Sequence, residues 1–164
     1  MNYLEYLNTW LKSELLQGKI MIGIGILLIP AFWAIIKSEH SLLKGTLIPL
    51  GLLLVVLIGY GSFMLYSRPA HAKAGMALYE KSETESLQTE RAKHVNDNKA
   101  GNTLMKVYPI LVIISMMPLF FNISDHYKGM GLGFAILFIA LFIIDYGFVS
   151  RSNAFIAFLD SLTR

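Results

Sequence analysis

One acidic residue, Asp145, lies inside an apolar run of the chain, Gly129 to Arg151. An ionisable group at membrane depth is costly and marks a candidate functional site. Arg151 follows six residues later, which places Asp145 about 9 Å from it along a helix and on a different face. The candidate partner is therefore Arg68, from another helix. Three interpretations stay open: an ion pair that locks two helices, a substrate or ion site, and exposure to interfacial water.

Two short acidic and histidine pairs form a second candidate site. Glu39-His40 and Asp125-His126 are expected near each other on the extracytoplasmic side. Two imidazoles and two carboxylates could bind Zn²⁺ or another divalent ion, and the histidines could sense pH. The alternative is two solvated turns that cap the helices after them.

A third group, Glu90, His94 and Asp97, has the spacing i, i+4, i+7 and so shares one helix face. The alternative is a solvated charged face, because one helix supplies no second pair of ligands. The spacing is neither H-E-x-x-H nor a paired Glu-x-x-His, so metallohydrolase or di-iron chemistry is not predicted. Phosphate-loop and nucleophile-elbow motifs are also missing. We therefore predict no catalytic residue and no cofactor.

The composition indicates a membrane protein. Of 164 residues, 55% are hydrophobic and 15% are charged, whereas soluble domains carry about 25% charged residues. The chain has no Cys, which excludes disulfides and thiolate metal sites. No basic run or aromatic-basic patch suggests nucleic acid as a partner.

Four apolar segments predict four transmembrane helices within a single all-α membrane domain, residues 1–164. The segments are 20–36, 46–66, 107–121 and 130–149. Amphipathic residues 1–18 and 152–163 predict interfacial helices at both ends. The polar stretch 67–106 predicts a helical hairpin outside the membrane, with Ser82 as N-cap and Glu85 at N3 of its second helix.

The basic residues predict the orientation, because cytoplasmic loops of membrane proteins are rich in Lys and Arg. One side would hold only Lys37, Lys44 and Lys128, and the other side would hold the remaining eleven basic residues. Both termini and the central hairpin are therefore expected in the cytoplasm.

The two halves of the chain resemble each other. The matching pairs, given in order, are Lys19 with Lys106, Pro30 with Pro118, Phe32 with Phe120, Ser38-Glu39-His40 with Ser124-Asp125-His126, Lys44-Gly45 with Lys128-Gly129, Ile58-Gly59-Tyr60-Gly61 with Ile144-Asp145-Tyr146-Gly147, and Ser67-Arg68 with Ser150-Arg151. Such parallel repeats are related by an axis along the membrane normal. We predict two helical hairpins packed as a four-helix bundle. Small residues allow close packing in lipid, and those predicted in the core are Gly23, Gly59, Gly61, Gly131 and Gly133.

Several short motifs are similar to those of an uncharacterised group of small bacterial inner-membrane proteins with four spans. They are KGTLIPLG, Tyr79-Glu80-Lys81, Glu90-Arg91 and the closing IIDYGFVSR. The resemblance covers most of the chain and implies a bacterial inner-membrane location, but no activity. It also implies one cytoplasmic-end cluster of Glu90, Arg91, Asp145 and Arg151.

Three functions fit these features. The first is a non-enzymatic assembly, accessory or regulatory module, whose partners are the lipid bilayer and either a second copy or another membrane protein. The second is an oligomeric channel or transporter for an ion or small solute that uses Asp145, and the third is a lipid-modifying enzyme. Because Asp145 matches Gly59 in the repeat, we expect it to point inward, toward the segment from Gly59 to Arg68.

Overall fold

The computed structural model describes residues 2–162, which are helical throughout except for short connections and contain no strand. The elements are α1 (Tyr3–Lys37), α2 (Ser41–Gly45), α3 (Leu47–Leu54), the π-helix η1 (Val55–Tyr60), α4 (Gly61–Lys81), α5 (Glu83–Met116), the 3-10 helix η2 (Met117–Phe120) and α6 (Asp125–Leu162). Because α3, η1 and α4 follow one another without a break, they form one rod, the α3–α4 rod. The predicted ends at residues 1 and 163, and Arg164, lie outside the described residues.

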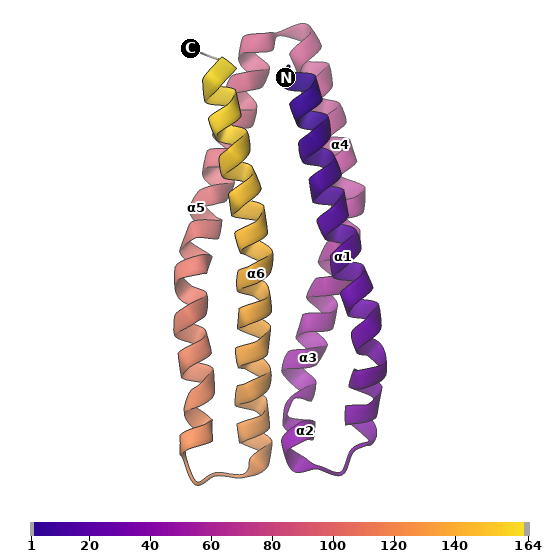
Figure 1. Ribbon diagram of the computed structural model, residues 1–164, viewed down its shortest axis with the longest axis vertical. Helices are drawn as coiled ribbons and strands as arrows, with labels where there is room; N and C mark the ends of the chain where they lie inside the picture. Colours follow the sequence, from indigo (N-terminus) through magenta and orange to yellow (C-terminus); the bar gives the residue numbers. More distant parts are fainter. Residues whose placement is uncertain (1, 163–164) are drawn as a thin grey trace.

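The four long helices lie side by side (Figure 1). The start of α1 and the end of α6 lie at the same end as the α4–α5 turn, and we call this the polar end. α1 packs along α4, α5 packs along α6, and α6 also packs against α2 and α3. This arrangement places α1, α4, α5 and α6 together around the axis of the polar end.

Side-chain caps fix two of the helix starts. Asn2 and Glu5 form a reciprocal capping box, in which the Glu5 amide donates to Asn2 Oδ1 at 2.9 Å. Ser82 is the N-cap of α5, where its hydroxyl accepts from the Glu85 amide at 3.4 Å. The predicted helix start at Ser82 is thus confirmed. Gly101 does not interrupt α5, because the residues around it keep the helical conformation.

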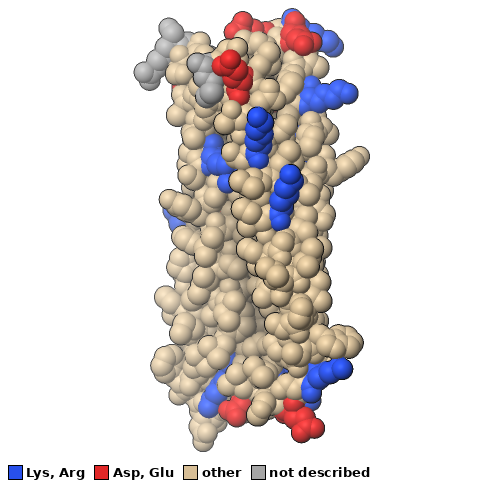
Figure 2. All heavy atoms as spheres, turned by 45° about the vertical axis from the view of Figure 1, so that its right-hand side comes forward, with Lys and Arg blue, Asp and Glu red and all other residues tan. Residues whose placement is uncertain are grey.

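Each of the four helices is long and apolar enough to cross a membrane. With η2 counted together with α5, they contain 35 to 38 residues, or about 53–57 Å at the helical rise, whereas a bilayer core is about 30 Å thick. Charged side chains gather toward the two ends of the molecule (Figure 2). Large apolar side chains face outward between them, among them Leu27, 79% exposed, and Ile113, 69% exposed. Such an apolar surface is unusual for a soluble protein.

The two predicted interfacial helices are not separate elements. Residues 3–18 are the first half of α1, and residues 152–162 are the last turns of α6. Their apolar residues form a core at the polar end, whose buried members are Tyr3, Leu7, Trp10, Ala72, Leu87, Phe155 and Leu159. An apolar stripe that could face a bilayer surface is here covered by other helices, because both segments continue straight out of their apolar helices.

Close helix contacts occur at a different set of glycines from the one predicted. Gly61, Gly131 and Gly133 are buried at helix contacts, as expected. Gly23 and Gly59 have no neighbour within 4 Å of an added Cβ, so they do not line the core. The turns at the end opposite the polar end hold a reciprocal contact instead. A Cβ on Gly45 would overlap the His126 carbonyl, and a Cβ on Gly129 would overlap the Leu42 carbonyl.

Candidate functional site

A buried carboxylate, Glu14 of α1, binds two arginines at the polar end. Its Oε2 lies 3.0 Å from Arg68 Nε of α4, and its Oε1 accepts from Arg151 Nε of α6 at 2.8 Å. Glu14 is only 2% exposed. A buried carboxylate is tolerated when charge partners compensate its lost hydration. The Glu14–Arg68–Arg151 triad therefore ties three helices together.

Neighbouring side chains hold the two guanidinium groups in place. Arg151 also donates to Gln17 Oε1, and Gln17 Nε2 donates to the Ile144 carbonyl at 3.2 Å. Arg68 lies 5.6 Å from the centre of the Trp10 ring, a cation–π distance. Arg151 is placed similarly over Phe148, at 5.3 Å. Both arginines are thus oriented by contacts beyond the ion pairs themselves.

Asp145 binds neither arginine. Its Oδ2 accepts from the Tyr108 hydroxyl of α5 at 2.7 Å. The prediction that Arg68 pairs with Asp145 is therefore wrong. Because the first half of α1 packs along the other helices, the Glu14 carboxylate lies between the two arginines. One of these arginines, Arg68, is the predicted partner of Asp145. Asp145 of α6 instead accepts a hydrogen bond from the neutral hydroxyl group of Tyr108.

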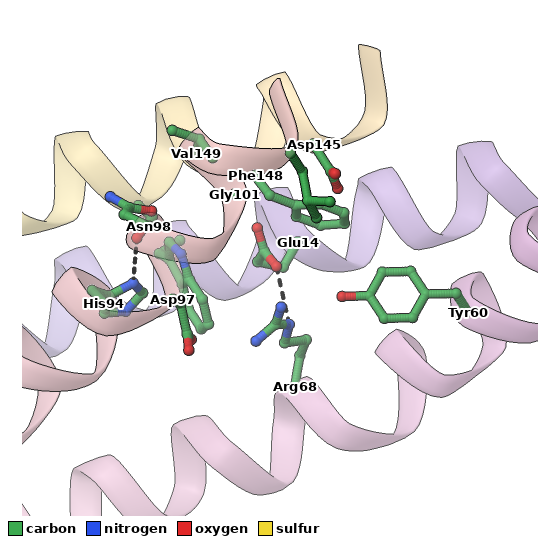
Figure 3. Close-up of a pocket in the computed structure, with 13 residues that line it drawn as sticks. Glu14, Tyr60, Arg68, His94, Asp97, Asn98, Gly101, Asp145, Phe148 and Val149 are labelled. Carbon is green, nitrogen blue, oxygen red and sulfur yellow. Dashed lines mark hydrogen bonds and ion pairs between the residues drawn. The ribbon is translucent and has the colours of Figure 1, made fainter. Parts of the chain in front are cut away.

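A chamber of about 330 Å³ lies next to the triad, between the helices. Glu14 and Arg68 line it together with Trp10, Tyr60 and Asp145. In Figure 3 the side chains of Glu14, Arg68 and Tyr60 point toward one another across this space. Asp145 is half-buried and shares the chamber with Tyr60 and Arg68. It thus shares a pocket with two residues of the predicted segment, but its hydrogen bond goes to α5 and Gly59 is exposed.

A second buried polar cluster lies around Glu90, which is 4% exposed. Its Oε2 lies 3.0 Å from His71 Nε2 and 3.8 Å from His94 Nε2. His94 Nδ1 in turn lies 2.8 Å from the Ser152 hydroxyl, and Lys93 Nζ lies 2.8 Å from His71 Nδ1. We call these five residues the Glu90 cluster. It joins α4, α5 and α6 on the polar-end side of the chamber.

Burial and charge act in opposite directions on the Glu90 cluster. Burial raises the pKa of Glu90, but the hydrogen bond to His71 and the electrostatic effects of His71, His94 and Lys93 outweigh burial and lower that pKa. Burial lowers the pKa of His94 to about 4. At neutral pH the cluster therefore holds an ionised Glu90 and a neutral His94.

The predicted cytoplasmic-end cluster is divided among separate contacts. Arg68 and Arg151 meet at Glu14, Asp145 binds Tyr108, and Glu90 binds His71. Arg91 pairs with Asp160 at 2.5 Å, where the two side chains are 48% and 40% exposed. His71 joins Glu90 and His94, whereas Asp97 lies exposed at the edge of the chamber.

The other predicted metal or pH-sensing site is solvent-exposed. Glu39, His40 and Asp125 are exposed, and His126 is partly buried. Within residues 2–162, no group of three or more His, Asp or Glu side chains is placed to hold a metal ion. The geometry gives the metal interpretation no support, and pH sensing by the two histidines stays a prediction.

Sequence reasoning missed Glu14, although a signal for it exists. The buried residues of α1 recur at steps of three or four: Tyr3, Leu7, Trp10, Glu14, Gly18, Met21 and Gly25. Such spacing is the seam of a helix packed along straight neighbours. An acid in the middle of that seam must be buried, and so it predicts a basic partner on another helix.

Three comparisons with known proteins found no match. No protein-family model, no curated protein and no solved structure matches the chain.

Proposed function

We propose that the chain is a multi-pass protein of a bacterial inner membrane, with both termini in the cytoplasm, that serves as a non-enzymatic assembly, accessory or regulatory module. The membrane placement is supported by the four long apolar helices and their outward apolar side chains. The orientation is supported by the excess of Lys and Arg in segments at the polar end.

The pairing of the polar groups carries the module proposal. Glu14 is bound by two arginines, Glu90 by His71, and Asp145 by Tyr108. Groups that could do acid or base chemistry are thus used to join helices. Such a structure suits a scaffold that presents its surface to a second copy or to another membrane protein.

The proposal includes an origin by tandem duplication. The reciprocal contact of Gly45 and Gly129 supports this proposal, because a two-fold axis between parallel repeats would produce such a contact. Arg68 and Arg151, which match in the sequence, bind opposite oxygens of one carboxylate. Gly45 and Arg68 are 23 positions apart, whereas Gly129 and Arg151 are 22 apart. The first half contains η1, and a π-helical turn accommodates one extra residue.

Photo-crosslinking tests the module proposal. A benzophenone amino acid at Lys73, which is exposed on α4, should capture a discrete protein or a second copy in native membranes. The same group at Trp33, 60% exposed on the apolar part of α1, is the matched control for lipid-facing positions. Capture at Trp33 alone, or at neither site, would contradict a module that works through its polar end.

A channel or transporter is the second candidate, because the 330 Å³ chamber lies beside Asp145. Purified protein in liposomes would then carry a proton or ion flux that Asp145→Asn abolishes without lowering thermal stability. The module proposal predicts no flux above that of empty liposomes for either protein.

A further inference from the structure

A second cavity lies next to the chamber, lined by residues of α5 and α6 alone. It is an apolar groove of about 310 Å³, lined by Tyr108, Pro109, Val112, Ile113, Ile139 and Phe142. On α5, Leu104 lines the chamber and Tyr108 lines the groove; on α6, Asp145 lines the chamber and Phe142 lines the groove. Each step is about one helical turn. The groove therefore begins about one helical turn beyond the chamber, on the side of the apolar half of the molecule.

The hydrogen bond between Tyr108 and Asp145 marks the junction of the two cavities. Tyr108 belongs to the groove, and its hydroxyl donates to Oδ2 of Asp145, which belongs to the chamber. No described residue donates a hydrogen bond to the other oxygen, Oδ1. A carboxylate in a partly buried site gains from a charged donor at such a position.

The charges around the chamber leave a negative excess. Three carboxylates line it, those of Glu14, Asp97 and Asp145, and Arg68 is the one guanidinium of the lining. Arg151 adds a second positive charge through Glu14. His94 adds none at neutral pH, because burial lowers its pKa to about 4. Three carboxylates against two guanidinium groups make the chamber a better site for a cation than for an anion.

We propose that the chamber and the groove together bind an amphiphile with a primary ammonium group, its head at Asp145 and its alkyl chain along α5 and α6. An ammonium group donates three hydrogen bonds, and the Asp145 Oδ1 atom and the Tyr60 hydroxyl oxygen are acceptors on the chamber wall. The alkyl chain fits the groove because the groove has an almost wholly apolar lining.

An anionic head group would be repelled in the chamber. Both arginines near the chamber are already bound to Glu14, and a phosphate or carboxylate would face Asp145 and Asp97. The inference rests on the membrane placement proposed above, since the groove would then open at bilayer depth. It deepens the module proposal by naming a ligand that could regulate the bundle.

Fluorescence of Trp10 provides the assay. The chain has two Trp residues, and Trp33→Phe leaves Trp10, which lines the chamber, as the reporter. The protein is placed in phosphatidylcholine nanodiscs and titrated with dodecylamine, dodecanoate or dodecanol at neutral pH. We expect a saturable change with dodecylamine, and affinities at least about tenfold weaker for the other two, because a charged hydrogen bond is lost. Equal responses to dodecylamine and dodecanoate would overturn the proposal.

Two variants test the head and the chain separately. Asp145→Asn should weaken dodecylamine binding at least about tenfold, with Asp125→Asn, an exposed acid at the start of α6, as the matched control. Val112→Phe should fill the groove and weaken dodecylamine binding while leaving binding of butylamine unchanged. Ile136→Phe, on an outward position of α6, is its control. If neither Asp145→Asn nor Val112→Phe changes binding, the proposal is wrong.

Two further measurements are needed. The first distinguishes a lipid headgroup from a free alkylamine as the source of the amine, and the second distinguishes a failure of this inference from a failure of the proposed membrane placement. Replacing part of the phosphatidylcholine by phosphatidylethanolamine should compete with dodecylamine if the headgroup of a lipid is the natural source. Lack of competition would assign the site to a free alkylamine. Helical circular dichroism and cysteine labelling of the topology show whether the chain folds and inserts, so an inserted chain that binds no amine would refute this inference alone.

Discussion

Glu14 has only 2% of its surface exposed, so its charge depends on Arg68 and Arg151 for compensation. Removing one partner of a buried ion pair usually costs about 3–5 kcal/mol, because the remaining charges lose their compensation. Replacing all the charges by well-packed apolar groups is often neutral or stabilising. We therefore expect removal of one member of the triad to destabilise the protein, and replacement of all three charges by apolar groups to be much less harmful.

We expect Glu14→Gln to lower the free energy of unfolding by about 3 kcal/mol, since two partly buried guanidiniums remain. The triple variant Glu14→Met, Arg68→Met, Arg151→Met should regain most of that loss. Titration with a denaturing detergent, followed by circular dichroism, measures both. Glu39→Gln, at an exposed position, is the control. A neutral effect of Glu14→Gln would show that the triad contributes little to folding.

His94 makes stability depend on pH. Its pKa is about 4 in the folded protein and about 6.5 when unfolded, so the unfolded chain binds more protons between these values. Stability should therefore be full above about pH 6.5 and fall by about 3 kcal/mol as the pH decreases to about 4. The lowered pKa of Glu90 extends the loss further into acid.

Unfolding midpoints at a series of pH values test this. The decline between about pH 6.5 and 4 should be much smaller in His94→Asn, whereas His40→Asn, at an exposed position, should keep the full decline. An equal decline in both variants would assign the pH dependence to other groups.

At the scale of helices, the tightest packing is between backbones. Gly129 lies against the Leu42 carbonyl, and a methyl group there has no room. Gly129→Ala should destabilise the protein by about 1–3 kcal/mol, because backbone must shift. Gly23→Ala, with nothing within 4 Å of the new methyl, should be neutral or stabilise by up to about 1 kcal/mol. The same detergent titration measures both, and similar losses in the two variants would contradict this packing.

The sequence predicted where helices lie along the chain better than it predicted which helices lie next to one another. Hydropathy located the four apolar segments, and cap chemistry located Ser82. Both are local properties of the chain. The partner of Arg68 depends on which helix lies beside α4, and that is decided by packing across distant parts of the sequence. Periodicity alone could not distinguish a stripe facing lipid headgroups from one facing other helices, so the first half of α1 and its Glu14 were misplaced.

For the whole molecule, the orientation in the membrane is the property that most needs measurement. The chain has no Cys, so single cysteines can be introduced without background. Thr84, near the α4–α5 turn, and Asn122, in the connection before α6, are both exposed. A membrane-impermeant maleimide applied to intact cells should label Asn122→Cys and should label Thr84→Cys only after lysis. The reverse pattern would invert the proposed topology.

The π-helix η1 has a further consequence for the α3–α4 rod. Each residue of an α-helix turns it by about 100°, so an extra residue would rotate everything after it unless a wider turn absorbs it. The buried Leu53 and the ion-paired Arg68 lie on opposite sides of η1. The π turn therefore absorbs the rotation of the extra residue. Residues before η1 and residues after it can then both face their partners in the bundle. Removing one residue from Val55–Tyr60 would preserve the apolar packing only by turning Arg68 away from Glu14.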